Sequence, residues 1–395
     1  MQNTMSSTFI INNQAEQDTS IIKLVDGILH TAIAQGASDI HFEPYAEKYR
    51  IRLRIDGMLY LAAEHDLAIA PRVSARIKVM AKLDIAEKRL PQDGRFTYVL
   101  DHDRTPLSSL QSQSQRRLDC RVGSCPTICG EKIVIRILSP PDTSLNINQL
   151  GLDVKQQQLF LKAIQATQGM ILVTGPTGSG KTVTLYTALN FLNTMERNIS
   201  TVEDPAEIHL PGINQVEINN KTDLTFATTL RAFLRQDPDV IMVGEIRDLE
   251  TAQIAIHAAQ TGHLVLATLH TNTAAESITR LLNMGISKFN LATSIKLIIA
   301  QRLLRVLCPS CKKKSQVVGC SFCKNGYKGR IGIFELLPIS QEISNIILED
   351  GNVLTLEQCA CRNGMALLQE AATQKIISGI TSAEEVNRVL GFSLE

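Results

Sequence analysis

The residues best suited to chemistry form one glycine-rich stretch, GPTGSGKT, near the middle of the chain. It matches the phosphate-binding pattern GxxxxGK[ST], follows an apolar run at 170–174 and opens a predicted helix over residues 181–192. Glycines let backbone N–H groups surround phosphates, and the helix amino terminus adds a favourable dipole. Lys181 is expected to reach the outer phosphates and the Thr182 hydroxyl to ligate Mg²⁺. The predicted nucleotide-binding residues are Gly175, Pro176, Thr177, Gly178, Ser179, Gly180, Lys181 and Thr182.

A carboxylate stands at the end of a second apolar run, residues 240–243, in the sequence VIMVGE. Gly244 occupies the position at which many phosphate-loop enzymes carry a metal-binding aspartate. Glu245 is therefore our candidate for polarising the attacking water and for holding Mg²⁺ through water. The alternative is a solvated glutamate at a strand end, but ligand sites of α/β proteins form at the carboxyl ends of strands.

Two further groups of polar residues accompany neighbouring apolar runs. The segment TVEDPAE places three carboxylates within five residues: Glu203, Asp204 and Glu207. Clustered carboxylates repel one another unless a cation compensates, so this group fits a position beside Mg²⁺, although acidic loops without a ligand are also common. His263 and His270 flank the apolar run at 264–269. Single histidines are more often structural, but these two flank one strand of the nucleotide-bearing sheet, which favours a role in sensing the γ-phosphate.

Four cysteines in CPSCKKKSQVVGCSFC form two CxxC pairs, Cys308, Cys311, Cys320 and Cys323. Four thiolates suit tetrahedral Zn²⁺, and a closed set of four leaves no open position for catalysis, so we predict a structural zinc knuckle over residues 308–323 rather than four idle thiols. The adjoining lysines read as a solvated tip. The other five cysteines have no such spacing and are interpreted as ordinary thiols.

The composition is that of an ordinary globular protein, with 395 residues, 44% hydrophobic residues and 20% charged residues. A formal net charge of +1 and the absence of Trp argue against stable nucleic-acid binding. No run of about 18 apolar residues and no signal-peptide pattern is present, so nothing is expected to span a bilayer. Nine cysteines without a secretion signal indicate reduced thiols in the cytoplasm.

The pattern of apolar residues divides the chain into two domains. Residues 1–19 read as a disordered tail, residues 20–139 as a small α+β domain, residues 140–148 as a proline-containing linker, and residues 149–395 as an α/β domain with a helical carboxyl-terminal region. In the first domain the helices are expected at 21–33 and 70–83, and the strands at 39–42, 49–55, 95–100, 118–122 and 132–138, with a polar loop at 101–117. In the second, apolar strands at 170–174, 199–202, 240–243 and 264–268 alternate with helices, which predicts a parallel sheet.

At this point a family resemblance becomes specific. The runs GPTGSGKTVTLYTAL, TVEDPAE and TLRAFLRQDPDVIMVGEIRDLETAQIAIHAAQTGHLVLATLHTN, together with GASDIHFEP, IRLRIDG and LDIAEKRLPQDGRF, resemble the secretion ATPases of type II secretion and type IV pilus assembly. The resemblance covers roughly residues 20–390. It implies a RecA-like ATPase core preceded by a PAS-like domain, hexamers with nucleotide between the two domains, and an inner-membrane platform protein as partner.

The same resemblance assigns roles to individual residues. TVEDPAE is similar to the Asp box, GEIRD contains the Walker B residue Glu245, and TGHLVLATLHTN is similar to the His box. In this family, arginines of the first domain reach the phosphates, and the matching residues here are Arg121 and Arg136. Further family arginines near the site match Arg231, Arg235 and Arg330. These roles are chemically reasonable, because an arginine supplied to the transferred phosphate raises the rate of phosphoryl transfer by about 10³–10⁵-fold.

Two features depart from the family pattern. The spacer between the CxxC pairs is short, which predicts a compact knuckle. Many relatives also carry another amino-terminal domain that docks the motor to its membrane partners, and about twenty residues before the first helix leave no room for it here.

We therefore expect a hexameric Mg-dependent ATPase that powers the assembly of pilin or pseudopilin fibres at the cytoplasmic face of the inner membrane, attached through partner proteins. The alternatives are a nucleic-acid translocating RecA-like motor, a DNA-uptake competence pseudopilus ATPase and a scaffold with an inert nucleotide site.

Overall fold

The computed structural model describes residues 5–100, 116–138, 145–313, 319–321, 323–349 and 351–391. The chain divides into two compact units, Met1–Asp142 and Thr143–Glu395. The division falls inside the predicted linker, residues 140–148, but the end of that stretch is not a linker. Ile147 begins a short 3₁₀ helix and is buried in the core of the second unit, because burial of its apolar side chain is favourable.

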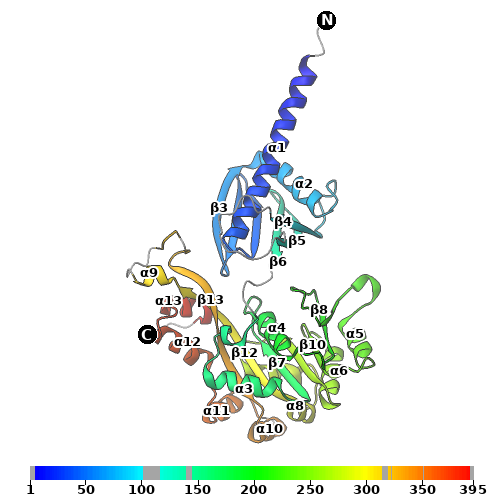
Figure 1. The fold of residues 1–395 in the computed structure, drawn as a ribbon, viewed down its shortest axis with the longest axis vertical. Coiled ribbons are helices and arrows are strands. Elements are labelled where there is room, and N and C mark those ends of the chain that lie inside the picture. Colours follow the sequence, from blue (N-terminus) through cyan, green and yellow to red (C-terminus); the bar gives the residue numbers. More distant parts are fainter. Residues whose placement is uncertain are drawn as a thin grey trace. The chain divides into compact units, whose positions relative to one another are not determined.

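The first unit is a six-stranded antiparallel sheet with two helices packed on its apolar face (Figure 1). The strand order is β3-β2-β1-β6-β5-β4. Its elements are α1 (Met5–Ala34), β1 (Asp39–Pro44), β2 (Lys48–Ile55), β3 (Met58–Asp66), α2 (Ala70–Met80), β4 (Gln92–Leu100), β5 (Arg116–Thr127) and β6 (Gly130–Leu138).

The alternating pattern of β2 explains how this sheet forms. Its apolar residues point into the core, and its arginines lie on the other face of the sheet. Asp56 (φ 49°) and Gly57 (φ 84°) then supply the two positive φ angles of a tight hairpin turn, so β3 returns beside β2.

Two predictions for the first unit, a disordered tail and a polar loop, differ from what the structure describes. We expected a disordered tail over residues 1–19, whereas α1 begins at Met5 and continues through the predicted helix. No Gly or Pro interrupts the sequence between residues 5 and 26, so nothing local ends the helix there. Of the predicted polar loop at 101–117, residues 101–115 lie outside the described residues, and the last two belong to β5.

The second unit contains a seven-stranded sheet of order β13-β12-β7-β11-β10-β8-β9. Six strands run parallel, and β13 pairs with β12 in the antiparallel direction, so the predicted parallel sheet is mixed. The strands are β7 (Gly169–Thr174), β8 (Ile199–Glu203), β9 (Asn214–Glu217), β10 (Val240–Val243), β11 (Leu264–Leu269), β12 (Ile295–Leu307) and β13 (Tyr327–Pro338). The helices are α3 (Val154–Ile164), α4 (Lys181–Leu192), α5 (Phe226–Phe233), α6 (Leu249–Gln260), α7 (Ala274–Asn283), α8 (Lys288–Ser294), α9 (Pro309–Lys313), α10 (Gln341–Leu348), α11 (Val353–Arg362), α12 (Leu368–Ile377) and α13 (Ala383–Leu390).

Alternate residues of the central strands fill two cores, one on each face of this sheet. On β7, Ile171 and Val173 pack with α3 and α4, whereas Met170 and Leu172 pack with the helices of the other face, among them α5, α6 and α7. Figure 1 shows these two helical layers around the sheet. Burial on both faces accounts for the continuous apolar runs from which the strands were predicted. The carboxyl ends of β7, β8, β10 and β11 consequently meet at one edge, called here the carboxyl edge.

Candidate nucleotide site and cysteine cluster

The phosphate loop joins the carboxyl end of β7 to the amino terminus of α4. Its first glycine, Gly175, has φ 147°, and a Cβ there would lie 2.6 Å from the carbonyl oxygen of Gln301 and from Ser179 Oγ, so only glycine fits. Lys181 Nζ donates to the carbonyl oxygens of Gly175 at 2.8 Å and Pro176 at 3.1 Å. The lysine is thus held within its own loop, with its ammonium group at the position where a phosphate-binding cation is needed.

The surroundings of Lys181 bring the pKa of its amine close to physiological pH. Burial lowers the pKa of Lys181 to about 8, the Arg302 charge acts in the same direction, and the Glu245 and Glu207 carboxylates oppose this shift. A bound phosphate would favour the protonated amine.

Glu245 lies just beyond β10, at the carboxyl edge, and its carboxylate is held from two sides. One oxygen accepts a hydrogen bond from Arg247 Nη2, and the other is 3.4 Å from His270 Nε2. Arg247 Nη1 in turn pairs with Asp204 at 3.3 Å. Burial, together with the charge of Lys181, lowers the pKa of His270, so this imidazole is neutral near pH 7. The structure therefore brings together the predicted residues Lys181, Glu245, Asp204 and His270.

Glu203 has a different environment from the one that the acidic cluster suggested. Its side chain is buried at the end of β8, where it accepts hydrogen bonds from the Tyr186 hydroxyl, from Thr201 Oγ1 at 2.7 Å and from Gln215 Nε2 at 3.1 Å. Three donors bind its two oxygens, so Glu203 holds the start of the acidic loop in place and is not available to Mg²⁺. Of the three predicted carboxylates, Asp204 and Glu207 are the exposed ones.

His263 is not brought to this site within the chain. It precedes β11 and therefore lies at the opposite edge of the sheet from His270, about 23 Å away along the strand. There its Nδ1 is 3.0 Å from the carbonyl oxygen of Ala258, at the end of α6. The expectation that both histidines face one γ-phosphate is wrong for a single chain, because the two ends of a strand cannot share an edge.

The predicted arginines fall in separate places. Arg121 and Arg136 are cross-strand neighbours on β5 and β6 of the first unit. Arg231 pairs with Glu250 at 2.6 Å between α5 and α6.

The remaining two arginines belong to the second unit as well. Arg235 is exposed just beyond the end of α5. The carbonyl oxygen of the next residue, Gln236, accepts a hydrogen bond from Asn198 Nδ2, and Asn198 directly precedes β8. Arg235 therefore lies toward the edge opposite Lys181. Arg330 lies on β13, opposite Arg305 of β12.

Sequence reasoning missed Arg302, whose buried guanidinium lies beside Gly175 of the phosphate loop and connects β12 to the loop after β11. Its Nη1 donates to the carbonyl oxygen of Gln301 at 3.0 Å, and its Nη2 to that of Asn272 at 3.0 Å. Burial lowers the pKa of Arg302. The available signal was the polar pair Gln-Arg inside the apolar run IKLIIAQRLLRVL.

The four cysteines of the two CxxC pairs converge between β12 and β13. Their sulfur atoms all lie within 4.8 Å of one another, with Cys308–Cys320 at 3.9 Å, Cys311–Cys323 at 3.6 Å and Cys320–Cys323 at 3.7 Å. Zn–S bonds of about 2.3 Å in a tetrahedron place sulfur atoms about 3.8 Å apart. The donor set and its spacing therefore fit one tetrahedral metal ion. Residues 314–318 and 322 lie outside the described part of the knuckle.

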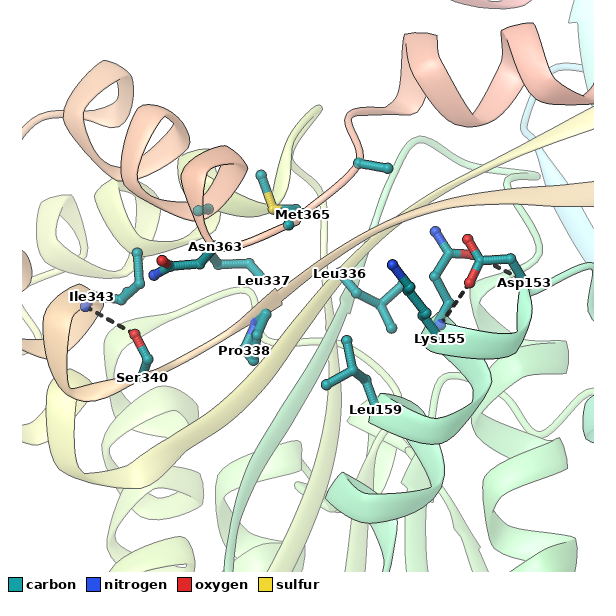
Figure 2. A pocket seen from close by; sticks show the side chains of 14 residues that line it. Asp153, Lys155, Leu159, Leu336, Leu337, Pro338, Ser340, Ile343, Asn363 and Met365 are labelled. Atoms are coloured by element: carbon teal, nitrogen blue, oxygen red, sulfur yellow. Dashed lines mark hydrogen bonds between the residues drawn. The ribbon is translucent and has the colours of Figure 1, made fainter.

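A separate cavity of about 100 Å³ lies among α3, the end of β13, α10 and α11, and Figure 2 shows its lining. Leu159, Leu336 and Ile343 contribute apolar surface, and Asp153 lies at its rim, where it caps α3. Ligand pockets usually measure about 300–1,000 Å³, so this cavity is too small for a nucleotide. It contains none of the predicted site residues.

The fold and the carboxyl-edge site define an α/β phosphate-loop ATPase. The family described as "Type II/IV secretion system protein" matches residues 14–388, and the chain belongs to this family. The type IV pilus assembly ATPase PilB of Pseudomonas aeruginosa is 51% identical in an alignment that covers 94% of this chain and 68% of that protein. PilB of Acinetobacter baylyi is 50% identical, over 95% of this chain and 67% of the relative. The type II secretion system protein E of Pseudomonas aeruginosa is 43% identical, over 95% of this chain and 76% of the relative.

Solved structures agree with the fold. The pilus retraction motor PilT with bound ADP is similar with a TM-score of 0.62 and 28% identity, covering 91% of this chain and 95% of PilT. The ATPase DotB of Legionella pneumophila reaches a TM-score of 0.68 at 24% identity, covering 92% of this chain and 94% of DotB, which supports the fold alone. Among the described residues, no helix is both long and apolar enough to cross a membrane.

Proposed function

We propose that this chain is a hexameric, Mg-dependent ATPase that powers the assembly of pilin fibres at the cytoplasmic face of the inner membrane. In this proposal the second unit is a RecA-like motor core and the first unit is a PAS-like domain. Identities of 50% and 51% to type IV pilus assembly ATPases, against 43% to a type II secretion relative, favour a pilus over a pseudopilus. An inner-membrane platform protein is the proposed partner, and the membrane is reached through it.

The residues at the carboxyl edge divide the chemistry among themselves. Lys181 and the backbone of residues 175–180 bind the phosphates of ATP. Mg²⁺, held by the Thr182 hydroxyl and through water by the carboxylates of Asp204 and Glu207, would neutralise phosphate charge. Glu245 orients the attacking water and takes up its proton, while His270 and Arg247 hold its carboxylate in place. Arg121 and Arg136 supply positive charge that stabilises the negative charge developing on the phosphates during transfer.

Structural Zn²⁺ at the four cysteines completes the proposed cofactor set. The fit of the sulfur spacing to a tetrahedron supports it, and the closed set of four thiolates leaves no position at which the metal could act on a substrate. The knuckle would stiffen the end of the β12–β13 pair.

One observation carries the proposed activity: Lys181 and Glu245 occupy the same edge and interact electrostatically. The test is steady-state ATP hydrolysis by the full chain and by Glu245→Gln and Lys181→Ala, with nucleotide binding measured in parallel. We expect Glu245→Gln to bind ATP but to lose nearly all turnover, and Lys181→Ala to lose binding as well. Wild-type turnover in Glu245→Gln would overturn the assignment. Hydrolysis that rises with added DNA in a salt-sensitive manner would instead favour a nucleic-acid motor.

A further inference from the structure

A row of arginines crosses the first unit on the face opposite its apolar core. The strand registers pair Arg54 with Asp39, Asp39 with Arg136, Arg136 with Arg121, and Arg121 with Arg95. Residues directly opposite one another in a sheet share a face, with Cβ atoms about 5 Å apart. Five adjacent strands thus place four guanidinium groups and one carboxylate in a line.

Asp39 lies inside this row and differs from its neighbours in burial. Its side chain is only 9% exposed, whereas that of Arg136 is 62% exposed. Asp39 Oδ1 accepts from Arg136 Nε at 3.1 Å, and Oδ2 accepts from Ser38 Oγ at 2.8 Å. Arg54 Nε lies 3.6 Å from the same carboxylate. The carboxylate is therefore fixed by the sheet, and the exposed arginine is attached to it.

The way in which Arg136 is attached matters for its chemistry. Asp39 engages the inner nitrogen, Nε, and among the described residues no other hydrogen bond or ion pair holds this side chain. The terminal nitrogens Nη1 and Nη2 remain exposed as a fork of donors, which is the geometry that binds two oxygens of one phosphate. A freely rotating arginine would lose side-chain entropy on binding phosphate, and an arginine already held at Nε loses less.

We propose that Asp39 is a positioning residue for ATP hydrolysis, which holds Arg136 by its Nε and presents the two terminal nitrogens to a phosphate of the nucleotide. This inference rests on the proposed function in one respect, that Arg136 acts on the phosphates. Asp39 does not touch the nucleotide; its effect passes through Arg136 alone.

Glu43 provides the internal comparison. It lies on the same strand and the same face, is also buried, and binds basic residues of both neighbouring strands, Arg52 at 2.8 Å and Lys132 at 3.0 Å. Although burial would raise it, these hydrogen bonds lower the pKa of Glu43 to about 2. Glu43 thus resembles Asp39 in burial and charge but does not contact Arg136.

The experiment is a double-mutant cycle on the full chain, with variants Asp39→Asn, Arg136→Ala and the double variant, and with Glu43→Gln as the matched control. For each protein we would measure kcat and KM for ATP, binding of a fluorescent ATP analogue, hexamer formation and thermal unfolding. Asp39→Asn is expected to lower kcat about 10- to 100-fold, the size of effect seen when a supporting residue misplaces a functional group. Analogue binding should change less than about threefold, and Glu43→Gln should keep wild-type kcat.

The cycle separates positioning from a general structural role. If Asp39 acts through Arg136, Asp39→Asn has no further effect on kcat in the Arg136→Ala background. An equal loss in both backgrounds, or an equal loss in Glu43→Gln, would overturn the inference and leave the role of Arg136 intact. Wild-type kcat in Arg136→Ala would instead reject the proposed role of Arg136, and the positioning role of Asp39 with it.

Discussion

The hydroxyl group of Tyr186 donates a hydrogen bond to the carboxylate of Glu203, and both side chains are buried beside the phosphate loop. Tyr186 belongs to α4, the helix that begins with Lys181, whereas Glu203 ends β8 and leads into the acidic loop. The same hydroxyl accepts the backbone N–H of Glu207 at 3.2 Å. Burial and the Glu203 charge raise the pKa of Tyr186, so it remains a donor at all physiological pH values. One phenol thus connects the helix that binds phosphate to the loop that carries Asp204 and Glu207.

Replacing Tyr186 with Phe should therefore weaken both stability and turnover. The change leaves a buried carboxylate with one donor fewer, which costs about 1–3 kcal/mol of the free energy of unfolding. Because the acidic loop loses its link to α4, we expect kcat to fall while the affinity for ATP is largely retained. Calorimetric unfolding and steady-state hydrolysis measure the two effects. Tyr49→Phe, which alters another fully buried tyrosine in the first unit, is the control and should leave turnover unchanged.

The depressed pKa of Lys181 predicts a pH dependence of nucleotide binding. Burial lowers this pKa to about 8 in the free protein, and a bound phosphate favours the protonated amine and so raises it. Above pH 8, binding must therefore take up a proton, and the affinity for ATP should fall with rising pH, by at most about tenfold per pH unit. Titration with a fluorescent ATP analogue between pH 7 and pH 9.5 measures this.

Lys181→Arg supplies the control for that titration, because a guanidinium stays protonated throughout the range. Whatever affinity this variant retains should not depend on pH between 7 and 9.5. An affinity of the wild-type chain that stays constant to pH 9.5 would contradict the assignment of the buried amine.

Short local patterns predicted the site well because they need no knowledge of the fold. The helix at 181–192 and the strand at 240–243 were predicted with the bounds that the structure shows. A phosphate loop, a strand and a following carboxylate are contiguous in sequence, so their positions at one edge follow from the parallel arrangement. His263 illustrates the limit of this reasoning, since flanking a strand says nothing about which end of it faces the ligand.

Features that depend on tertiary pairing were not predicted. The run IKLIIAQRLLRVL lacks any period that separates a strand from a buried helix, and its role as β12 depends on pairing with β7 and β13. The position of Arg302 beside the phosphate loop depends on that register, and the burial of Glu203 depends on Tyr186 and Gln215 from other elements. Contacts between residues far apart in sequence leave no signal in a single chain.

A buried ion network fixes the last helix, α13, to β12, and its loss should destabilise the second unit. Glu385 is fully buried and accepts from Arg305 Nη2 at 2.7 Å and from Arg388 Nη2 at 2.7 Å. Glu385→Gln leaves both arginines without their carboxylate, and we expect a loss of about 3–5 kcal/mol in the free energy of unfolding, measured by denaturant titration. Glu384→Gln removes the same charge from an exposed neighbouring position and should change stability by less than about 0.5 kcal/mol.

The same network predicts how stability responds to acid. Burial would raise the pKa of Glu385, but hydrogen bonds from Arg388 and Arg305 lower it from 4.5 to about 2. The unfolded chain therefore binds more protons than the folded one between these values, so the contribution of about 3 kcal/mol is present above pH 4.5 and is lost as the pH falls toward 2. Glu385→Gln should flatten this part of the stability profile. An unchanged profile in that variant would show that other carboxylates govern acid unfolding.

The cysteine cluster predicts one zinc ion per chain whose removal acts on the knuckle and not on the phosphate loop. Cys308→Ser removes one of four thiolates, so elemental analysis should find little zinc in the purified variant. Cys361→Ser, which alters an exposed thiol outside the cluster, should keep the wild-type zinc content.

Because Cys308 directly follows β12 and its N–H donates to the carbonyl oxygen of Gly326 before β13, loss of the metal should loosen the end of this strand pair. Hydrogen exchange should then increase around residues 304–330, while Lys181 continues to bind nucleotide. A structural metal would be contradicted if wild-type protein purified without chelators contained no zinc and its residues 304–330 were still fully protected from hydrogen exchange.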